Sequence, residues 1–330
     1  MAITQLGKKG MFLTFISIAI IAAVIIIFTP SGLDLSKNMP VIKTRVSNVN
    51  EYVLDLENVY LENALKATGR KTLIGLIGHV KDNGFFANAV EFENAFSEVL
   101  LYGEYNGNNI GVMYENTYND WLNQIVITAK NTYNIDTTFS PIQLTDIQVY
   151  QIRPWFIEVE ADITFSVTSE TASWTRDVTI KTEISVENFD DPYYLVNTGG
   201  SYINKIRKSD TKFDEWSDEK VIDFIEDGNY THFEDGQAPS FLMRFYNDIS
   251  ASSCCGIESL VNPNNPSISN KDVSYVDYLY WSSVENCANP PYTLLRVDKI
   301  HTEFPNFKFD LNHLAKYKLS ADEQICPPPG

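Results

Sequence analysis

Cysteine and histidine are the residue types in this sequence that could do covalent or acid–base chemistry. The chain of 330 residues holds four of each, and all four cysteines lie in its last third, at Cys254, Cys255, Cys287 and Cys326. A cysteine thiol beside His301 or His313 would form a nucleophile with its base. The competing interpretation is that the cysteines are oxidised, and the predicted location of the region decides between the two.

An even number of cysteines confined to an exported region predicts two disulfides, with three connectivities open. Adjacent cysteines seldom bridge each other, so we expect Cys254 and Cys255 to have different partners. The tail after Cys326 is Pro-Pro-Pro-Gly, which cannot pack by itself, so we expect a bridge at Cys326. The chain has no Cys-x-x-Cys and no paired histidines near the cysteines, so we predict no zinc site.

Acidic turns and one glycosylation signal follow the middle of the chain. The runs 226–229 and 234–236 are rich in carboxylates, but their spacing does not fit a twelve-residue calcium loop, so we interpret them as solvated turns. Asn229-Tyr230-Thr231 is a sequon, which predicts Asn229 as a glycosylation site if this region lies outside the cell.

Motifs for catalysis and cofactor binding are missing from the sequence. There is no Gly-x-Ser-x-Gly, no His-Glu-x-x-His, no phosphate loop and no dinucleotide fingerprint. We therefore predict a non-catalytic protein with no catalytic residue, cofactor or metal. The many carboxylates leave an exported, glycosidase-like hydrolase open as an alternative.

An apolar stretch from Met11 to Phe28 carries eighteen residues without a charge. As a helix it is about 27 Å long, enough to cross the hydrocarbon core of a bilayer. Lys8 and Lys9 precede it, which predicts a cytoplasmic N-terminus and an extracellular C-terminal ectodomain in a single-pass cell-membrane protein. The net charge is −18 although the first ten residues are basic, so the ectodomain would repel nucleic acid.

The order Lys8-Lys9-Gly10 followed by an uninterrupted apolar helix resembles the class III signal of type IV pilins and archaeal pilin-like proteins. The resemblance implies cleavage between Gly10 and Met11. It also implies that the apolar helix serves first as a membrane anchor and then as a filament core. An uncleaved anchor is the alternative. The ectodomain resembles uncharacterised membrane-anchored archaeal surface proteins in the segments 191–193, 256–261 and 276–278, a likeness that implies no activity.

Composition and periodicity divide the chain into six segments. These are a cytoplasmic leader over 1–10, a transmembrane helix over 11–28, a joint over 29–39, a helical region over 40–140, an antiparallel β region over 141–208, and an acidic, cysteine-containing region over 209–330.

A heptad-like apolar stripe predicts a long spacer helix from Pro40 to Gly69. Its apolar side chains recur at spacings of four and three, at Ile42, Val46, Val49, Val53, Leu56 and Tyr60. The stripe from Ile42 to Tyr60 could self-associate as a coiled coil, or it could pack on the protein's own sheet, which we favour.

Three shorter helices are predicted over 71–81, 87–101 and 117–132. The first carries His79 on its apolar side, which we interpret as a core histidine. The buried faces of the other two are expected at Val90, Phe92, Phe96, Val99 and Leu100, and at Trp121, Ile125 and Thr128.

Alternating segments over 142–149, 155–168, 175–186 and 194–206 predict an antiparallel meander. In the second, residues 157–165 alternate an apolar face with an acidic one, as a sheet with one solvated side requires. The preceding helices would cover the apolar face, which defines an α+β fold. Farther on we expect helices over 241–248 and 311–318 and strands over 275–281 and 292–300.

The sequence therefore predicts a surface protein with a disulfide-stabilised α+β ectodomain, either a pilin-like subunit or an adhesion component. Its expected partners are the lipid bilayer, further copies of itself through the anchor and spacer helices, and a surface protein or glycan. A monomeric envelope ectodomain or receptor is the first alternative, and the exported hydrolase is the second.

Overall fold

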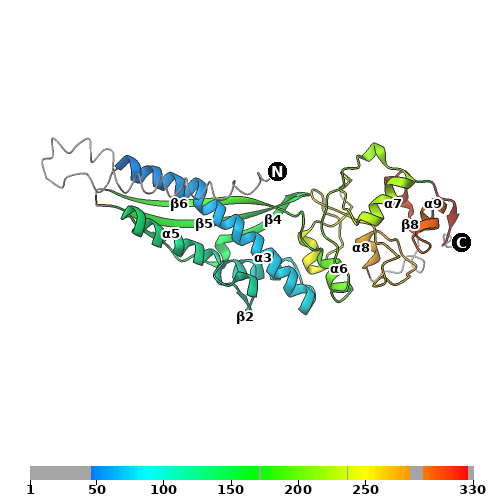
Figure 1. The fold of residues 1–330 in the computed structure, drawn as a ribbon, viewed down its shortest axis with the longest axis horizontal. Helices are drawn as coiled ribbons and strands as arrows, with labels where there is room; N and C mark the ends of the chain where they lie inside the picture. Colours follow the sequence, from blue (N-terminus) through cyan, green and yellow to red (C-terminus); the bar gives the residue numbers. More distant parts are fainter. Residues whose placement is uncertain (1–45, 171, 236, 283–292, 326–330) are drawn as a thin grey trace, which may run out of the picture.

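The computed structural model describes residues 46–325 except 171, 236 and 283–292. The predicted leader, anchor and joint, together with Cys287 and Cys326, lie outside the described residues. Within the described ranges, no helix combines the length and the apolar character needed to cross a bilayer. The fold is α+β with antiparallel sheets, and it is elongated, with long helices and strands in one half and short elements in the other (Figure 1).

One long helix runs along the first half. It covers residues 46–55, continues through the π-helical turn η1 (Leu56–Tyr60) and α3 (Leu61–Asn83), and ends at Gly84, whose φ is 89°. The predicted end at Gly69 is wrong, and the separate helix expected over 71–81 is the last part of α3. Gly69 faces the sheet, where an added Cβ would lie 2.8 Å from Ile184 Cδ1. Glycine serves close packing there rather than helix termination.

The apolar stripe of this helix packs on the protein's own sheet. Val49, Val53 and Leu56 are buried, and the Tyr52 hydroxyl lies 3.1 Å from Thr137 Oγ1 in the sheet. Val46 and Tyr60 are only partly buried. The favoured interpretation of the stripe, packing within the chain, is confirmed for its described part.

Helix α4 (Ala89–Tyr102) begins at Asn88, whose side chain accepts a hydrogen bond from the Glu91 amide. Four of its predicted core residues, Phe92, Phe96, Val99 and Leu100, are buried. Val90 is 64% exposed, so the predicted face is too wide on that side.

Helix α5 (Tyr118–Tyr133) begins with a capping box between Thr117 and Asp120. Its buried side chains are Tyr118, Leu122 and Ala129. The predicted face is wrong at Trp121, which is 40% exposed, and at Thr128, which is also exposed, whereas Ile125 is partly buried and packs against the core.

The main sheet has strand β5 (Phe156–Thr168) at its centre. Strand β6 (Ser173–Ser185) pairs with one edge of β5 over its whole length. On the other edge, β4 (Ile147–Arg153) and β3 (Asp136–Phe139) pair with successive parts of β5. All these pairs are antiparallel, as predicted, and β3 is a strand that the sequence pattern did not indicate.

The two faces of the sheet differ as their alternation predicts. Side chains of residues 157, 159, 161, 163 and 165 are buried, and α3 to α5 lie on that side (Figure 1). The other face carries a cross-strand ladder, in which Thr179 donates to Asp162 at 2.6 Å and Thr164 donates to Asp177 at 2.7 Å.

The fourth predicted strand, over 194–206, is wrong. Helix α6 (Pro192–Asn197) occupies its start, with Asp191 accepting a hydrogen bond from the Tyr193 amide and Pro192 in the first turn. The tyrosines, leucine and valine of this segment have strand propensity, but Asp-Pro is a helix-start signal that fixes the local conformation.

The second half is built from short elements. The acidic segment contains α7 (Asp218–Asp227), capped by Ser217, where no helix was predicted. A short helix, α8 (Asp277–Tyr280), replaces the strand predicted over 275–281. The other elements of the second half are η4 (Phe213–Glu215), η5 (Leu242–Tyr246), β7 (Leu294–Arg296), α9 (Asp298–Glu303), β8 (Phe309–Asp310), α10 (Leu311–Lys316) and β9 (Glu323–Gln324). The first half also contains the short elements β1 (Glu104–Tyr105), β2 (Asn108–Asn109), η2 (Gly111–Met113) and η3 (Leu144–Asp146).

The two halves share one continuous hydrophobic core. The ring of Phe92 on α4 lies 4.8 Å from that of Phe245 on η5, measured between centroids. The Phe86 amide donates to the Phe245 carbonyl at 3.0 Å, and the Arg70 guanidinium lies 4.9 Å from the Phe189 ring centroid. Helix α3, the α3–α4 connection and the first turn of α4 therefore hold the second half in place.

Candidate functional site

A groove lies between the C-terminal half of α3 and the loop that follows the β1–β2 hairpin. Its cavity of about 500 Å³ is lined by one face of the helix and by residues 108–112. A second cavity of about 250 Å³ adjoins it, with His79, Asn83 and Asn108 in the walls of both. The first volume is within the range of small-molecule sites. We call the two cavities together the His79 groove.

The hairpin wall is built by a two-residue turn. Asn106 and Gly107 have φ values of 50° and 74°, and they connect β1 to β2. Asn-Gly is a strong sequence signal for a hairpin, since both turn positions need positive φ. Sequence reasoning missed this wall, and the Asn106-Gly107 dipeptide could have identified it.

Two glycines on α3 shape the groove. A Cβ at Gly75 would clash with the Ile110 side chain, so glycine lets the loop approach the helix. A Cβ at Gly78 would have nothing within 4 Å, so this residue leaves the floor of the groove open. The loop after the hairpin therefore contacts the helix at Gly75, and the groove opens between them at Gly78.

His79 stands at the centre of the groove in a fixed orientation. Its ring stacks on Phe86 at 5.6 Å and meets the edge of Tyr105 at 5.1 Å, between centroids. Asn83 Nδ2 donates to the His79 carbonyl at 3.0 Å and lies 3.3 Å from its Nδ1. Burial lowers the pKa of His79, which favours the neutral ring. Its packing agrees with a core histidine, but it is only half-buried and forms part of a cavity wall.

The lining of the groove is rich in polar side chains. Carboxamides from Asn83, Asn106, Asn108 and Asn109 offer both donors and acceptors. The Glu91 carboxylate already accepts from the Tyr105 hydroxyl at 3.0 Å and from the Ala87 amide at 2.6 Å. Among the described lining residues no nucleophile faces a base.

The structure joins Cys254 to Cys255 by a disulfide. The expectation that these two adjacent cysteines have different partners is therefore wrong. A tight turn leaves Cys254 exposed and Cys255 buried, and both sulfurs contact the Gln151 carbonyl oxygen at 3.5 and 3.4 Å. Neither is a thiol in this oxidised state, so no dyad with His301 or His313 forms. Bridges at Cys287 and Cys326 stay predictions, because both residues lie outside the described ranges.

Asn229 follows α7 and is partly exposed. Its Nδ2 donates to Asp227 at 3.3 Å, and the next residue, Tyr230, is fully buried. Glycosylation of Asn229 stays a prediction. In the part of the chain that the structure describes, no group of three or more histidine, cysteine or acidic side chains is placed to hold a metal ion.

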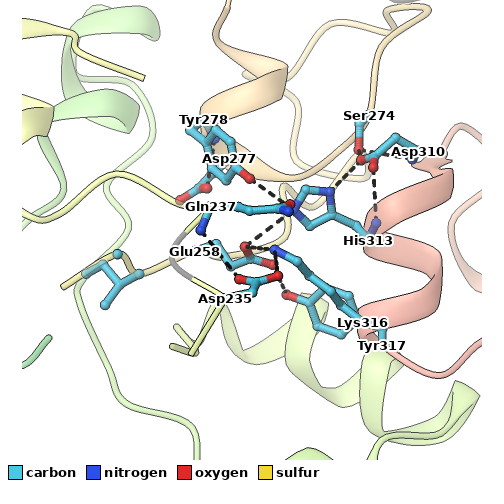
Figure 2. A network of polar contacts seen from close by, with 12 residues as sticks. Asp235, Gln237, Glu258, Ser274, Asp277, Tyr278, Asp310, His313, Lys316 and Tyr317 are labelled. Carbon is cyan, nitrogen blue, oxygen red and sulfur yellow. Dashed lines mark hydrogen bonds and ion pairs between the residues drawn. The ribbon is translucent and has the colours of Figure 1, made fainter. Parts of the chain in front are cut away.

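A buried polar network surrounds His313 in the second half (Figure 2). Its Nδ1 lies 2.7 Å from Asp310 Oδ2, and its Nε2 lies 3.0 Å from the Tyr278 hydroxyl and 3.4 Å from Glu258 Oε2. Burial lowers the pKa of His313, but the two carboxylates outweigh it and raise the pKa to about 10. Burial raises the pKa of Asp310, but hydrogen bonds from His313 and Ser274 lower it to about 2.

The network closes on itself through the last helix. Lys316 Nζ lies 3.0 Å from Asp235 and 3.8 Å from Glu258, and the Tyr317 hydroxyl donates to Glu258 at 3.0 Å (Figure 2). Ser274 donates to Asp310 rather than to His313, so the serine, aspartate and histidine do not form a catalytic relay. The arrangement favours a structural role that fixes α10 to the second half.

Arg244 forms a second buried centre. Its guanidinium lies 2.6 Å from Asp191 and 2.8 Å from Asp277, and all three side chains are fully buried. Burial raises the pKa of Asp277 to about 6 against the opposing effect of Arg244. The Ile257 carbonyl also accepts from Arg244. The segments 191–193, 256–261 and 276–278 therefore meet at one arginine, which sequence reasoning missed.

Comparison of the chain with protein-family models, with curated proteins and with solved structures found no match.

Proposed function

We propose that this chain is a non-catalytic cell-surface protein, a pilin-like subunit or adhesion component that carries the His79 groove away from the membrane. In this proposal residues 11–28 cross the cell membrane once, with the N-terminus in the cytoplasm. The described residues then lie outside the cell.

The long helix carries the proposal. It enters the described structure at residue 46, which follows the predicted anchor and joint in the sequence, and it continues without a break to the groove. From Val46 to Gly78 an α-helical rise of 1.5 Å per residue gives about 48 Å. The described part of its apolar stripe packs against the protein's own sheet. This packing makes the helix a stiff spacer. Assembly into filaments would then depend on the segment from Met11 to Phe28 rather than on the stripe from Ile42 to Tyr60.

The intact mass of the protein extracted from membranes tests the pilin-like part. A mature chain that begins at Met11 is the expected result. A chain that retains Met1 would rule out pilin-type processing and would leave an uncleaved anchor.

Location and assembly need separate measurements. Protease added to whole cells should digest the ectodomain, and recovery of the protein in the soluble cytoplasmic fraction would overturn the proposal. Filaments seen by electron microscopy would support a subunit, whereas discrete detergent-solubilised monomers would support the alternative of an anchored envelope ectodomain or receptor.

A further inference from the structure

We infer that the His79 groove binds a neutral, hydroxyl-rich ligand of the sugar class, such as the terminal residues of a surface glycan. The inference rests on the proposed function, because the groove is exposed to surface glycans only if the described residues lie outside the cell. Its chemical argument comes from the groove itself.

The charge of the groove lining disfavours anionic ligands. The described residues that line the two cavities include no lysine and no arginine, and the lining carries the carboxylates of Asp82 and Glu91. His79 adds no compensating positive charge at neutral pH, because burial lowers its pKa. Phosphate, sulfate and sialic acid would meet repulsion with no cation to bind them.

The hydrogen-bonding groups of the groove match the hydroxyl groups of a sugar. Each asparagine side chain offers one acceptor and two donors, which matches a sugar hydroxyl that both gives and receives a hydrogen bond. The side chains of Asp82 and Asn109 make no hydrogen bond to any described residue, so they are available to a ligand. Asn83 is held in place through His79.

An apolar wall completes the site. Ile74 is 43% exposed and Val112 is 39% exposed, and they flank the open floor at Gly78. Aliphatic side chains and carboxamides in one cavity suit a pyranose, which has an apolar ring face and a polar edge. The cavity of about 500 Å³ holds one or two sugar residues.

The test uses the full chain in a detergent without a sugar headgroup. The probes are immobilised oligosaccharides that end in mannose, galactose or N-acetylglucosamine, with a sialylated oligosaccharide and inorganic phosphate as anionic comparisons. We expect saturable binding to at least one neutral probe and at least tenfold weaker binding to the anionic ones. Failure to bind any neutral probe, or equal binding to the anionic ones, overturns the inference.

Two substitutions place the binding in the groove. Gly78→Phe fills the open floor, and we expect it to reduce binding at least tenfold. Ala67→Phe adds the same ring at an exposed position of the same helix and should leave binding unchanged. Asn109→Ala removes one carboxamide and should weaken binding by about threefold to tenfold.

Thermal unfolding of each variant checks that the fold is retained. If Gly78→Phe folds and still binds with full affinity, the sugar site is not in this groove and the inference is wrong. The proposed function is judged separately, since a chain that is displayed on cells and begins at Met11 can fail to bind every sugar.

Discussion

Arg244 lies fully buried between Asp191 and Asp277, and such an arrangement is most sensitive to the loss of one member. Removing the guanidinium leaves two carboxylates in an apolar setting with no cation. The penalty for an unpaired buried charge then falls on the folded state alone.

Arg244→Met should therefore lower the free energy of unfolding by about 3–5 kcal/mol, measured by urea denaturation. Arg153→Met, at an exposed pair with Glu183, is the matched control and should change the free energy by less than about 1 kcal/mol. Adding Asp277→Asn to Arg244→Met should restore part of the loss. Equal effects of the two single substitutions would contradict a special role for the buried cluster.

His313 gives the molecule a pH dependence with a definite sign. Glu258, Asp310, Tyr278 and Lys316 surround it, and its pKa of about 10 in the fold exceeds the ordinary value of 6.5. The folded state therefore holds a proton that the unfolded state loses first. This contribution to stability is complete below pH 6.5 and is lost as the pH rises through 10.

We expect His313→Gln to be less stable than the wild type at pH 6, and the difference in free energy of unfolding to shrink steadily toward pH 10. Urea midpoints at pH 6, 8 and 10 measure it. Other groups that titrate in this range are common to both proteins and cancel in the difference. A difference that stays constant across these pH values would show that His313 stabilises by packing alone.

At the scale of elements, a helix or strand could be predicted where its sequence pattern has one dominant physical cause. The alternation in β5 comes from one buried and one solvated face, and the apolar stripe of the long helix comes from its contact with the sheet. The segment after Asp191 was mispredicted because strand propensity and a helix-start signal compete there, and the helix-start signal fixes the local conformation. The groove depends on where the Asn106-Gly107 hairpin meets α3, a contact that no single segment encodes.

Gly69 and Gly78 on α3 show how tertiary contact changes the effect of one residue type. Replacing a helical glycine by alanine ordinarily stabilises a helix by about 0.5–1 kcal/mol. Gly78 has open space, so Gly78→Ala should raise the free energy of unfolding by that amount. At Gly69 the added Cβ would lie 2.8 Å from Ile184 Cδ1, so crowding opposes the gain.

Gly69→Ala should therefore be less stable than Gly78→Ala by about 1 kcal/mol or more, measured by thermal unfolding of the two variants side by side. The helix-propensity term is the same in both and drops out of the comparison. Equal stabilities would mean that the helix does not approach the sheet as closely as the structure has it.

At the scale of the whole molecule, the question is whether the two halves unfold together. The composition placed a boundary at residue 208, but the strands of the main sheet end at Ser185 and the core continues across the junction. Phe92 lies at this junction, buried against Phe245 and Phe86. Sequence reasoning identified it as a core residue of its helix without indicating that its partner lies about 150 positions away.

Phe92→Ala should lower the free energy of unfolding by about 3–5 kcal/mol, the cost of a large cavity in a packed core. Because the junction belongs to one core, hydrogen exchange should accelerate by similar factors in peptides from β5 and in peptides around Tyr275, which lie in different halves. Val90→Ala, on the exposed side of the same helix, should leave both unchanged. Faster exchange confined to the first half would instead mean that the halves fold independently, and that the second half stays folded without the junction between α3 and α4.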